Sequence, residues 1–160
     1  MAKLVLRTHL AAPADKVWAA VQTPALLEHV AAPVLRFDPV SGATPAVWDG
    51  AHEVRLRLFG LIPLGPQVID VSRDVSRARE GVRRIRDNGR GRLARVWDHW
   101  ITIADDGRGG TAYEDAVEIR AGLLTPGVWL FAFGFYAWRQ HRWRRLVARD
   151  FRIGGRAAFA

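Results

Sequence analysis

The sequence predicts an α+β fold in which a curved antiparallel sheet of about seven strands wraps around one long C-terminal helix. Three observations support this: a series of alternating apolar segments, two short helices after the first of them, and an unbroken helical pattern over the last third. Strands joined by tight turns pair antiparallel, and the long helix must cover the apolar face of their sheet. No linker, repeat or low-complexity tract interrupts the chain, so we expect a single domain over residues 1–160.

The first elements are one strand and two short helices. Residues 3–10 alternate well enough for a strand, and a helix starts after it at Ala12-Pro13. Thr23 and Pro24 are a helix-start pair, in which the hydroxyl caps and the proline fits the first turn, so a second helix is expected through about Val30. Two short helices in tandem are therefore expected after the first strand.

The middle of the chain predicts six further strands, with hairpins between the later ones. They are expected at residues 34–39, 52–59, 67–77, 81–87, 93–104 and 111–120. The segments DNGRGR and DDGRGG predict tight hairpin turns. The loop GLIPLGP carries apolar Leu61 and Ile62, which is unusual in a turn-rich segment. Either this loop closes a cavity or meets a partner, or its apolar side chains tuck under the edge of the sheet.

The long helix is expected to start at Thr125-Pro126 and to continue until Gly154-Gly155. Between residues 128 and 138 it is apolar on every side, over a run too short to span a bilayer. Three covers for these outer aromatics remain open: the GLIPLGP loop with the short helices, a second copy in a homodimer, or a peripheral membrane contact.

Composition limits the chemistry and the compartment. The chain has no cysteine, which excludes disulfides, thiolate metal sites and cysteine nucleophiles. Residues 1–12 lack the apolar core of a signal peptide, so we expect a cytoplasmic protein. The net charge is +8, and arginines concentrate at residues 73–95 and 139–156. These blocks are either basic surfaces for an anionic partner or a habit of using arginine at solvated positions.

The order of elements resembles the START-like superfamily, also called the SRPBCC or polyketide cyclase/dehydrase and lipid-transport group, with its helix-grip fold. The resemblance rests on LAAPADKVWAAV after the first strand, TPALLEHV as the second short helix, and the closing helix from Thr125. It implies a cavity between sheet and helix that takes lipids, sterols, polyketides, plant hormones or aromatic compounds. Carriers, sensors, cyclases and oxygenase domains share this fold, so the fold leaves the activity open.

Binding or carriage of a hydrophobic or amphipathic small molecule is the function we favour, without a cofactor. One face of the long helix carries Arg139 among apolar residues, and a guanidinium there needs a carboxylate, a ligand anion or an outlet to water. The residues expected to line the cavity are Leu56, Leu58, Leu61, Ile62, Trp97, Trp100, Tyr113, Trp129, Ala132, Tyr136, Arg139 and Trp143.

The alternative is an enzyme of the cyclase or dehydratase type. His99 lies beside Asp98 on one expected strand, and Tyr113 and Asp115 lie on the next, so a histidine with an acid partner is within reach. A histidine on a strand is more often a structural group, and catalysis requires these side chains to share one pocket. The five histidines show no metal-ligand spacing, so no metal site is expected.

A third function is a basic surface module that binds anionic membrane or RNA through the two arginine blocks. Neither block carries exposed aromatic platforms for base stacking beyond those needed for packing, which makes nucleic acid an unlikely partner.

Overall fold

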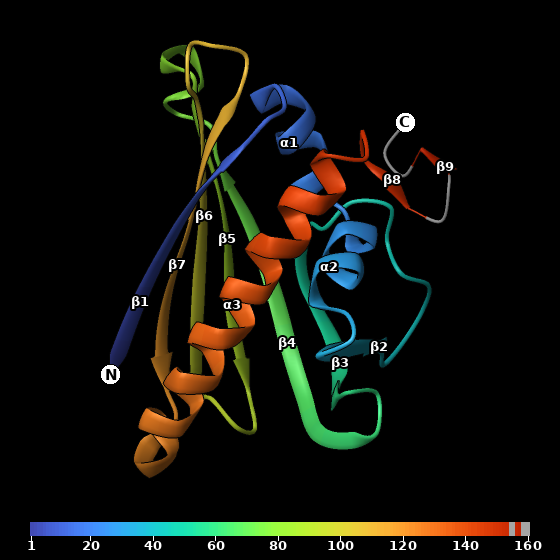
Figure 1. Ribbon diagram of the computed structural model, residues 1–160. Helices are drawn as coiled ribbons and strands as arrows, with labels where there is room; N and C mark the ends of the chain where they lie inside the picture. Colours follow the sequence, from blue (N-terminus) through green and yellow to red (C-terminus); the bar gives the residue numbers. More distant parts are fainter. Residues whose placement is uncertain (154–155, 158–160) are drawn as a thin grey trace.

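The computed structural model describes residues 1–153 and 156–157 (Figure 1). The elements are β1 (Ala2–Leu10), α1 (Ala14–Val21), α2 (Pro24–Ala31), β2 (Leu35–Pro39), β3 (Gly50–Leu58), β4 (Ile62–Asp74), η1 (Ala78–Glu80), β5 (Val82–Gly91), β6 (Val96–Asp105), β7 (Thr111–Arg120), η2 (Gly122–Leu124), α3 (Thr125–Val147), β8 (Arg152–Ile153) and β9 (Arg156–Ala157). This order confirms the predicted α+β fold.

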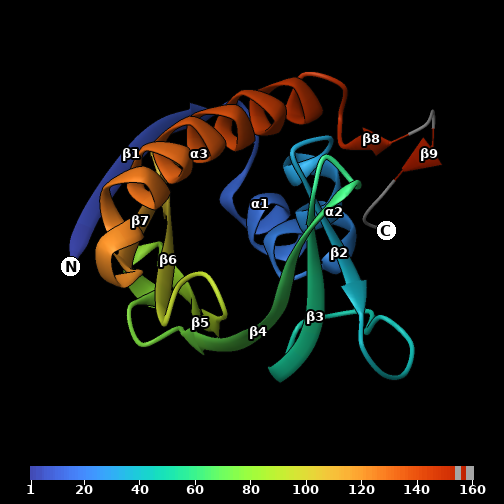
Figure 2. The same ribbon diagram turned by 90° about the horizontal axis from the view of Figure 1, so that it is seen from below.

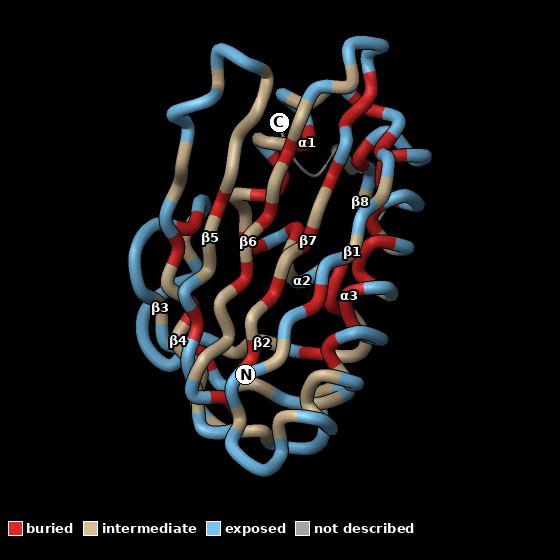
Figure 3. The backbone as a smooth tube through the Cα atoms, turned by 90° about the vertical axis from the view of Figure 1, so that its left-hand side faces the viewer, coloured by how far each residue is buried: buried red, intermediate tan, exposed pale blue. Residues whose placement is uncertain are grey.

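The first seven strands form one antiparallel sheet in the order β1-β7-β6-β5-β4-β3-β2. Viewed from below, the sheet curves around the interior, α3 crosses its open side, and α1 and α2 fill the space beside α3 (Figure 2). Along the strands, buried positions alternate with exposed ones (Figure 3), as expected for a sheet with one face inward. The helix-grip arrangement is therefore confirmed.

The short helices form where the sequence predicts them. The side-chain oxygen of Thr23 accepts a hydrogen bond of 3.2 Å from the backbone N–H of Leu26, and Pro24 occupies the first turn of α2. This cap satisfies one of the backbone donors that a helix start leaves free. The buried side chains of Val17 in α1 and Leu26 in α2 then join the core.

The long helix α3 begins at Thr125 as predicted but ends at Val147. Asp150 and Phe151 adopt positive φ values of 50° and 58°, which end the helical path. Phe151 turns back so that its ring meets Trp143 edge-on, with ring centroids 6.2 Å apart. Tertiary packing thus stops α3 about two turns before the predicted end at residues 154–155, which lie outside the described residues.

The hairpin predicted at DNGRGR is wrong in its position. Strand β5 continues through Asn88 and Gly89, which pair with Asp98 and Trp97 of β6. The glycines of this segment allow neighbouring atoms to lie close to the strand and do not form a turn. A Cβ at Gly91, for example, would lie 2.1 Å from the side-chain oxygen of Gln67. The actual connection to β6 follows Gly91.

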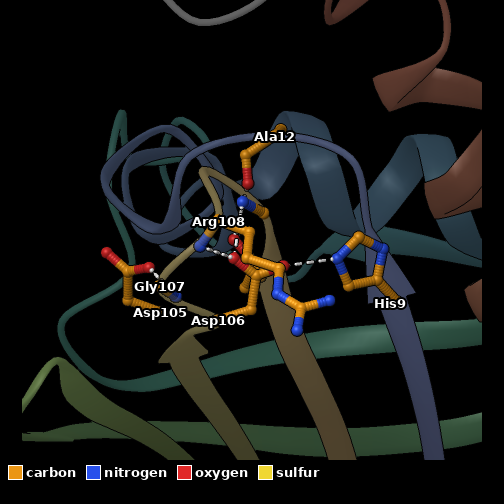
Figure 4. Close-up of polar contacts among 8 residues, drawn as sticks. His9, Ala12, Asp105, Asp106, Gly107 and Arg108 are labelled. Atoms are coloured by element: carbon orange, nitrogen blue, oxygen red, sulfur yellow. Dashed lines mark hydrogen bonds and ion pairs between the residues drawn. The ribbon is translucent and has the colours of Figure 1, made fainter.

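The predicted turn at DDGRGG is confirmed between β6 and β7. The carboxylate of Asp106 accepts 2.8 Å hydrogen bonds from the backbone N–H groups of Arg108 and Gly110 (Figure 4). Its other oxygen lies 2.7 Å from Nε2 of His9 on β1. The His9 contact is the main reason that the pKa of Asp106 falls to about 2, with the backbone bonds adding to it. The turn is therefore held to β1 as well as closed on itself.

The interior has two parts along α3. Around Trp143 and Leu146, the strand ends and α1 pack into a closed core. Around Phe135 and Tyr136, the apolar side chains of β1, β2 and β7 pack against the first half of α3. Within the described part of the chain, no helix is long and apolar enough to cross a membrane.

Candidate functional site

A cavity of about 280 Å³ lies between the curved sheet and α3. Its walls are mostly apolar, with side chains from α2, from β2 to β6 and from the first half of α3. Representative lining residues are Leu26, Leu35, Leu56, Leu58, Ile69, Ile85, Trp97, Phe131 and Phe135. A concave, apolar space with few polar groups is the usual form of a small-molecule site.

Five polar or charged residues contribute to the lining besides Tyr136: Gln67, Arg86, Asp87, His99 and Arg139. Arg86 is already neutralised, because its guanidinium donates two 2.8 Å hydrogen bonds to the carboxylate of Asp98. The remaining charged groups, Asp87 and Arg139, approach the cavity from opposite walls, one on β5 and one on α3.

Arg139 is buried, with 5% of its surface exposed. Among the described residues its guanidinium has no hydrogen-bond or ion-pair partner, and its Nε is fully enclosed. The guanidinium carbon lies 4.9 Å from the ring centre of Tyr136 and 5.8 Å from that of Phe135. Burial lowers the pKa of Arg139, but the electrostatic effects of Asp115, Tyr136, Tyr113 and Asp87 together outweigh burial and raise it, so the residue stays cationic.

Asp87 faces the cavity directly opposite His99 in the β5–β6 ladder. Its Oδ1 accepts a 2.9 Å hydrogen bond from the backbone N–H of Asp70. Burial raises the pKa of Asp87 to about 7, although this hydrogen bond and the charge of Arg139 act in the other direction. The carboxyl therefore exchanges its proton near neutral pH.

A buried hydrogen-bond network stands behind the cavity, with the carboxylate of Asp115 at its centre. Asp115 Oδ1 lies 2.8 Å from His99 Nε2 and accepts a longer bond of 3.3 Å from the Tyr113 hydroxyl. Oδ2 accepts a 2.9 Å bond from the amide of Gln140, which also donates to the backbone oxygen of Leu6. This buried charge has all the donors that its burial requires.

The protonation states within the network follow from burial and contact. Burial lowers the pKa of His99 more than the hydrogen bond to Asp115 raises it, so the ring is neutral at pH 7. Burial acts to raise the pKa of Asp115, but the His99 contact and the charge of Arg139 lower it overall. Because an ionised carboxylate only accepts, Nε2 of His99 carries the hydrogen and Nδ1 is left as an acceptor.

Five of the twelve expected ligand-binding residues line the cavity: Leu56, Leu58, Trp97, Tyr136 and Arg139. Trp97 donates a 3.1 Å hydrogen bond to the Tyr136 hydroxyl, and burial raises the pKa of Tyr136, so this pair stays neutral. Whether these five side chains contact a ligand stays a prediction.

The other expected residues lie elsewhere for clear reasons. Trp100 alternates with His99 along β6 and so lies on the outer face of the sheet, where the guanidinium of Arg84 covers its ring at 4.1 Å. Asp98 lies on that outer face as well, paired with Arg86. Neither shares the cavity with His99.

Four further expected residues lie in packing contacts outside the cavity lining: Tyr113, Ala132 and Trp143 are buried, and Trp129 is half-buried. Tyr113 lies against Trp143, with ring centroids 5.8 Å apart, and Ala132 is enclosed among α3 contacts. Trp129 donates a 2.9 Å hydrogen bond to the backbone oxygen of Lys3 at the edge of the sheet. The helical wheel placed Trp129, Ala132 and Trp143 on the face of α3 that meets the sheet, but that face is longer than the cavity.

The GLIPLGP segment does not tuck under the sheet. Leu61 and Ile62 are 80% and 54% exposed, whereas Leu64 lines the cavity. Strand β4 starts at Ile62, inside the segment that the sequence predicted as a loop.

The aromatic first half of α3 is covered mostly within the chain. Phe131 and Phe135 line the cavity, and Trp138 donates a 2.9 Å hydrogen bond to the backbone oxygen of Ala32. Leu130 and Phe133 remain exposed. A homodimer or a membrane contact through this segment stays a prediction.

Asp87, like Gln67 and Arg86, is a polar cavity residue that the sequence did not single out. The predicted turn at Asn88-Gly89 ended the strand at this point, which hid its inward direction. Alternation from the buried Ile85 two positions earlier is the signal that places Asp87 inward. Across residues 1–153 and 156–157, no cluster of three or more histidine, aspartate or glutamate side chains is arranged to hold a metal ion.

Solved structures with the same fold cover nearly the whole chain at low sequence identity. A START superfamily protein from Mycobacterium smegmatis is 13% identical, with a TM-score of 0.62 and coverage of 92% of this chain and 98% of that one. The Zhui aromatase/cyclase from Streptomyces sp. R1128 is 13% identical, with a TM-score of 0.65 and coverage of 96% and 98%. The norcoclaurine synthase from Thalictrum flavum is 13% identical, with a TM-score of 0.61 and coverage of 92% and 86%.

These likenesses confirm the START-like helix-grip fold that the sequence resembled. No curated protein sequence matches the chain. A family model described as a domain of unknown function, DUF8410, matches residues 8–150. The chain therefore belongs to the DUF8410 family and has the helix-grip fold of START-like proteins.

Proposed function

We propose that the protein binds, and in that way carries, an amphipathic small molecule in the cavity between the sheet and α3. The observation that carries this proposal is an apolar cavity of about 280 Å³ whose wall includes the buried guanidinium of Arg139 with no polar partner among the described residues. A buried charge without a partner is costly, and a ligand that supplies an acceptor removes that cost.

The cavity suits a molecule with an apolar body and one polar end. Leucine, isoleucine and aromatic side chains make up most of its wall, so an apolar body replaces water there with favourable burial. Arg139 and Tyr136 lie together on α3 and provide the polar contacts for the other end. The volume lies at the small end of the range for ligand sites, which indicates a compact molecule over a bulky one.

Displacement of a neutral apolar fluorophore, N-phenyl-1-naphthylamine, tests whether the cavity binds ligands. Leu56 lines the cavity, so Leu56→Trp fills part of it and is expected to abolish probe binding. Arg55 is the neighbouring exposed residue on β3, so Arg55→Trp is the matched control and is expected to bind the probe as the original protein does. Native mass spectrometry of protein incubated with a lipid extract then identifies what is retained. Equal probe binding by both variants, with no retained molecule, contradicts the proposal.

A second candidate is an enzyme that transfers protons during a cyclisation or dehydration. His99 lines the cavity, Asp115 holds its Nε2, and Nδ1 is left as an acceptor. Asp87 stands opposite His99 with a pKa near 7. Two of the solved structures of this fold are named as an aromatase/cyclase and a synthase.

Product analysis distinguishes the enzyme from the carrier. A metabolite extract is incubated with the protein and with His99→Gln, and the masses of its components are compared. A dehydration yields products that have lost water, and a cyclisation without that loss yields isomers with a changed chromatographic retention, in both cases only when His99 is present. Identical masses and retention times in both samples, together with retained ligand, leave binding alone as the function.

A further inference from the structure

The two charged groups that face each other across the cavity specify the chemistry of the ligand's polar end. Arg139 offers guanidinium N–H donors with no acceptor among the described residues. A guanidinium is a planar donor whose best complement is a carboxylate, which accepts two parallel hydrogen bonds. A hydroxyl or an ether oxygen accepts fewer of these bonds and brings no charge.

Asp87 is the second member of the pair. Its Oδ1 is held by the backbone N–H of Asp70, and the structure shows no partner for Oδ2 among the described residues. When ionised, this carboxyl repels a second carboxylate, but when protonated it donates a hydrogen bond to one. Proton exchange at Asp87 therefore decides whether an anion is accepted beside Arg139.

We propose that the ligand is a carboxylic acid bound as its anion, with the carboxylate between the Arg139 guanidinium and the Asp87 carboxyl, and that Asp87 takes up a proton as the acid binds. This inference rests on the proposed function and adds the chemical class of the ligand to it.

The surrounding charges are compatible with this exchange. The titratable and charged groups near the pair are Asp70 on β4, Arg86 on β5, Asp98 and His99 on β6, Tyr113 and Asp115 on β7, and Tyr136 on α3. Arg86 and Asp98 neutralise each other, and burial keeps His99, Tyr113 and Tyr136 neutral at pH 7.

Asp115 stays ionised but is already bonded by its own three donors, so its negative charge does not use the donors of Arg139. The bound carboxylate then replaces the negative charge that Asp87 loses on protonation. Above about pH 7, where Asp87 is ionised before the ligand binds, this exchange leaves the total charge of the site unchanged and avoids the cost of adding a net charge to an apolar cavity.

Three ligands with the same tail separate the alternatives: decanoate, decan-1-ol and decylamine. Their binding is measured by displacement of N-phenyl-1-naphthylamine at pH 6 and pH 8.5. Decanoate is ionised at both values, so any change in its affinity reports the protein. We expect decanoate to bind best at pH 6 and to weaken about tenfold by pH 8.5, because its binding takes up a proton. Decan-1-ol is expected to show no such change.

Two variants and a control locate the effect. Arg139→Met is expected to weaken decanoate binding about tenfold or more, the usual cost of a lost charge-assisted hydrogen bond, and to leave decan-1-ol unchanged. Asp87→Asn keeps a donor but takes no proton, so its decanoate affinity is expected to be independent of pH. Arg144→Gln, on the exposed side of α3 where Arg144 donates to Thr8, is the control and is expected to behave like the original protein.

Calorimetric titration of decanoate in two buffers of different ionisation enthalpy counts the protons directly. We expect uptake that approaches one proton at pH 8.5 and none for Asp87→Asn. Equal affinity for decanoate and decan-1-ol, or an unchanged decanoate affinity in Arg139→Met, overturns the assignment of an acid but leaves the cavity as a binding site. Failure of every ligand and of the fluorophore to bind refutes the proposed function itself.

Discussion

The interior holds two buried charged groups, Asp115 and Arg139, that differ in their hydrogen-bond partners. Asp115 receives hydrogen bonds from three side chains. Arg139 donates no hydrogen bond to the described residues, although its neighbour in the sequence, Gln140, is one of the three donors to Asp115. A buried charge with a complete set of partners serves the fold, whereas one without partners costs stability and indicates a site for something else. The comparison therefore separates the structural part of the interior from the binding part.

The largest expected effect comes from removing the satisfied charge. Asp115→Ala removes the acceptor shared by His99, Tyr113 and Gln140, of which Gln140 keeps only its bond to Leu6, and takes away the negative charge that most favours the cationic form of Arg139. We expect the free energy of unfolding to fall by about 3–5 kcal/mol, as for other broken buried ion networks. Urea denaturation measures the change.

Asp115→Asn is the matched control, because its amide keeps the shape and one acceptor oxygen. Its expected loss is smaller, about 1–3 kcal/mol. A loss below about 1 kcal/mol in the alanine variant would show that the network contributes little, and the contrast with Arg139 would then fail.

The next effect concerns the pH dependence of stability through Asp87. The folded pKa of about 7 is higher than the unfolded value of 3.8. Between these values the folded state holds a proton that the unfolded state has lost, so stability falls as the pH rises from about 4 to about 7. The full shift corresponds to roughly 4 kcal/mol, and we expect about half of that because Asp87 faces the cavity.

Urea denaturation of the original protein and of Asp87→Asn at pH 5 and pH 8 tests this. As the pH rises from 5 to 8, the unfolding free energy of the original protein is expected to fall relative to that of the asparagine variant. Carboxylates with lowered pKa values, such as Asp98 and Asp106, act in the other direction but cancel in this difference. The same difference at both pH values would rule out a raised pKa at Asp87.

A smaller effect is expected at Gln140, which belongs to the satisfied side of the comparison. Gln140→Met keeps the length of the side chain but removes its bonds to Asp115 and to the backbone oxygen of Leu6. We expect a loss of about 1–2 kcal/mol, measured by thermal unfolding. Gln22→Met serves as the reference, because it removes the hydrogen bond that Arg73 donates to Gln22 at the end of α1, outside this network. A Gln140 variant as stable as the original would show that Asp115 manages with two donors.

The smallest effect on stability is expected at Arg139. Arg139→Met replaces an unpaired buried cation with an apolar side chain of similar length, so we expect no loss and a gain of up to about 1 kcal/mol. Thermal unfolding without added ligand is the measurement. A loss of several kcal/mol would mean that Arg139 stabilises the fold, and its lack of partners would then no longer indicate a ligand.

Local sequence signals were sufficient where the chemistry is local. The cap of Thr23 on α2 and the Asp106 turn each involve residues a few positions apart, and both form as predicted. These local signals were insufficient where a contact between residues far apart in the sequence determines the structure. The end of α3 is set by Phe151 folding back on Trp143. Asn88-Gly89 stays in a strand that pairs with β6, where Gly89 lies close to the Gln67 side chain and to the backbone of Trp97.

The candidate site was predictable in the same limited sense. Helical spacing identified Arg139 as a charge on an inward face, and Trp97 was expected in the cavity together with Trp100, which the structure places on the outer face. Sequence spacing could not show which inward positions border the cavity. Trp143 and Tyr113 also occupy inward positions, but they pack within the core. Asp87 was missed since the direction of its side chain depended on where its strand ended.

Adjacent positions on α3 have different roles, which bears on how a substitution would change ligand preference. Gln140, Trp138 and Arg142 fix the rotation of α3 through bonds to β1, β7 and α2, and Arg139 projects roughly 100° around the axis from Gln140. We therefore expect a substitution at position 139 to change ligand preference without disturbing the contacts that hold α3 in place. A glutamine at position 139 would suit a ligand with a neutral polar end, and a leucine would suit a wholly apolar ligand. A single substitution would then change selectivity while the fold stays the same.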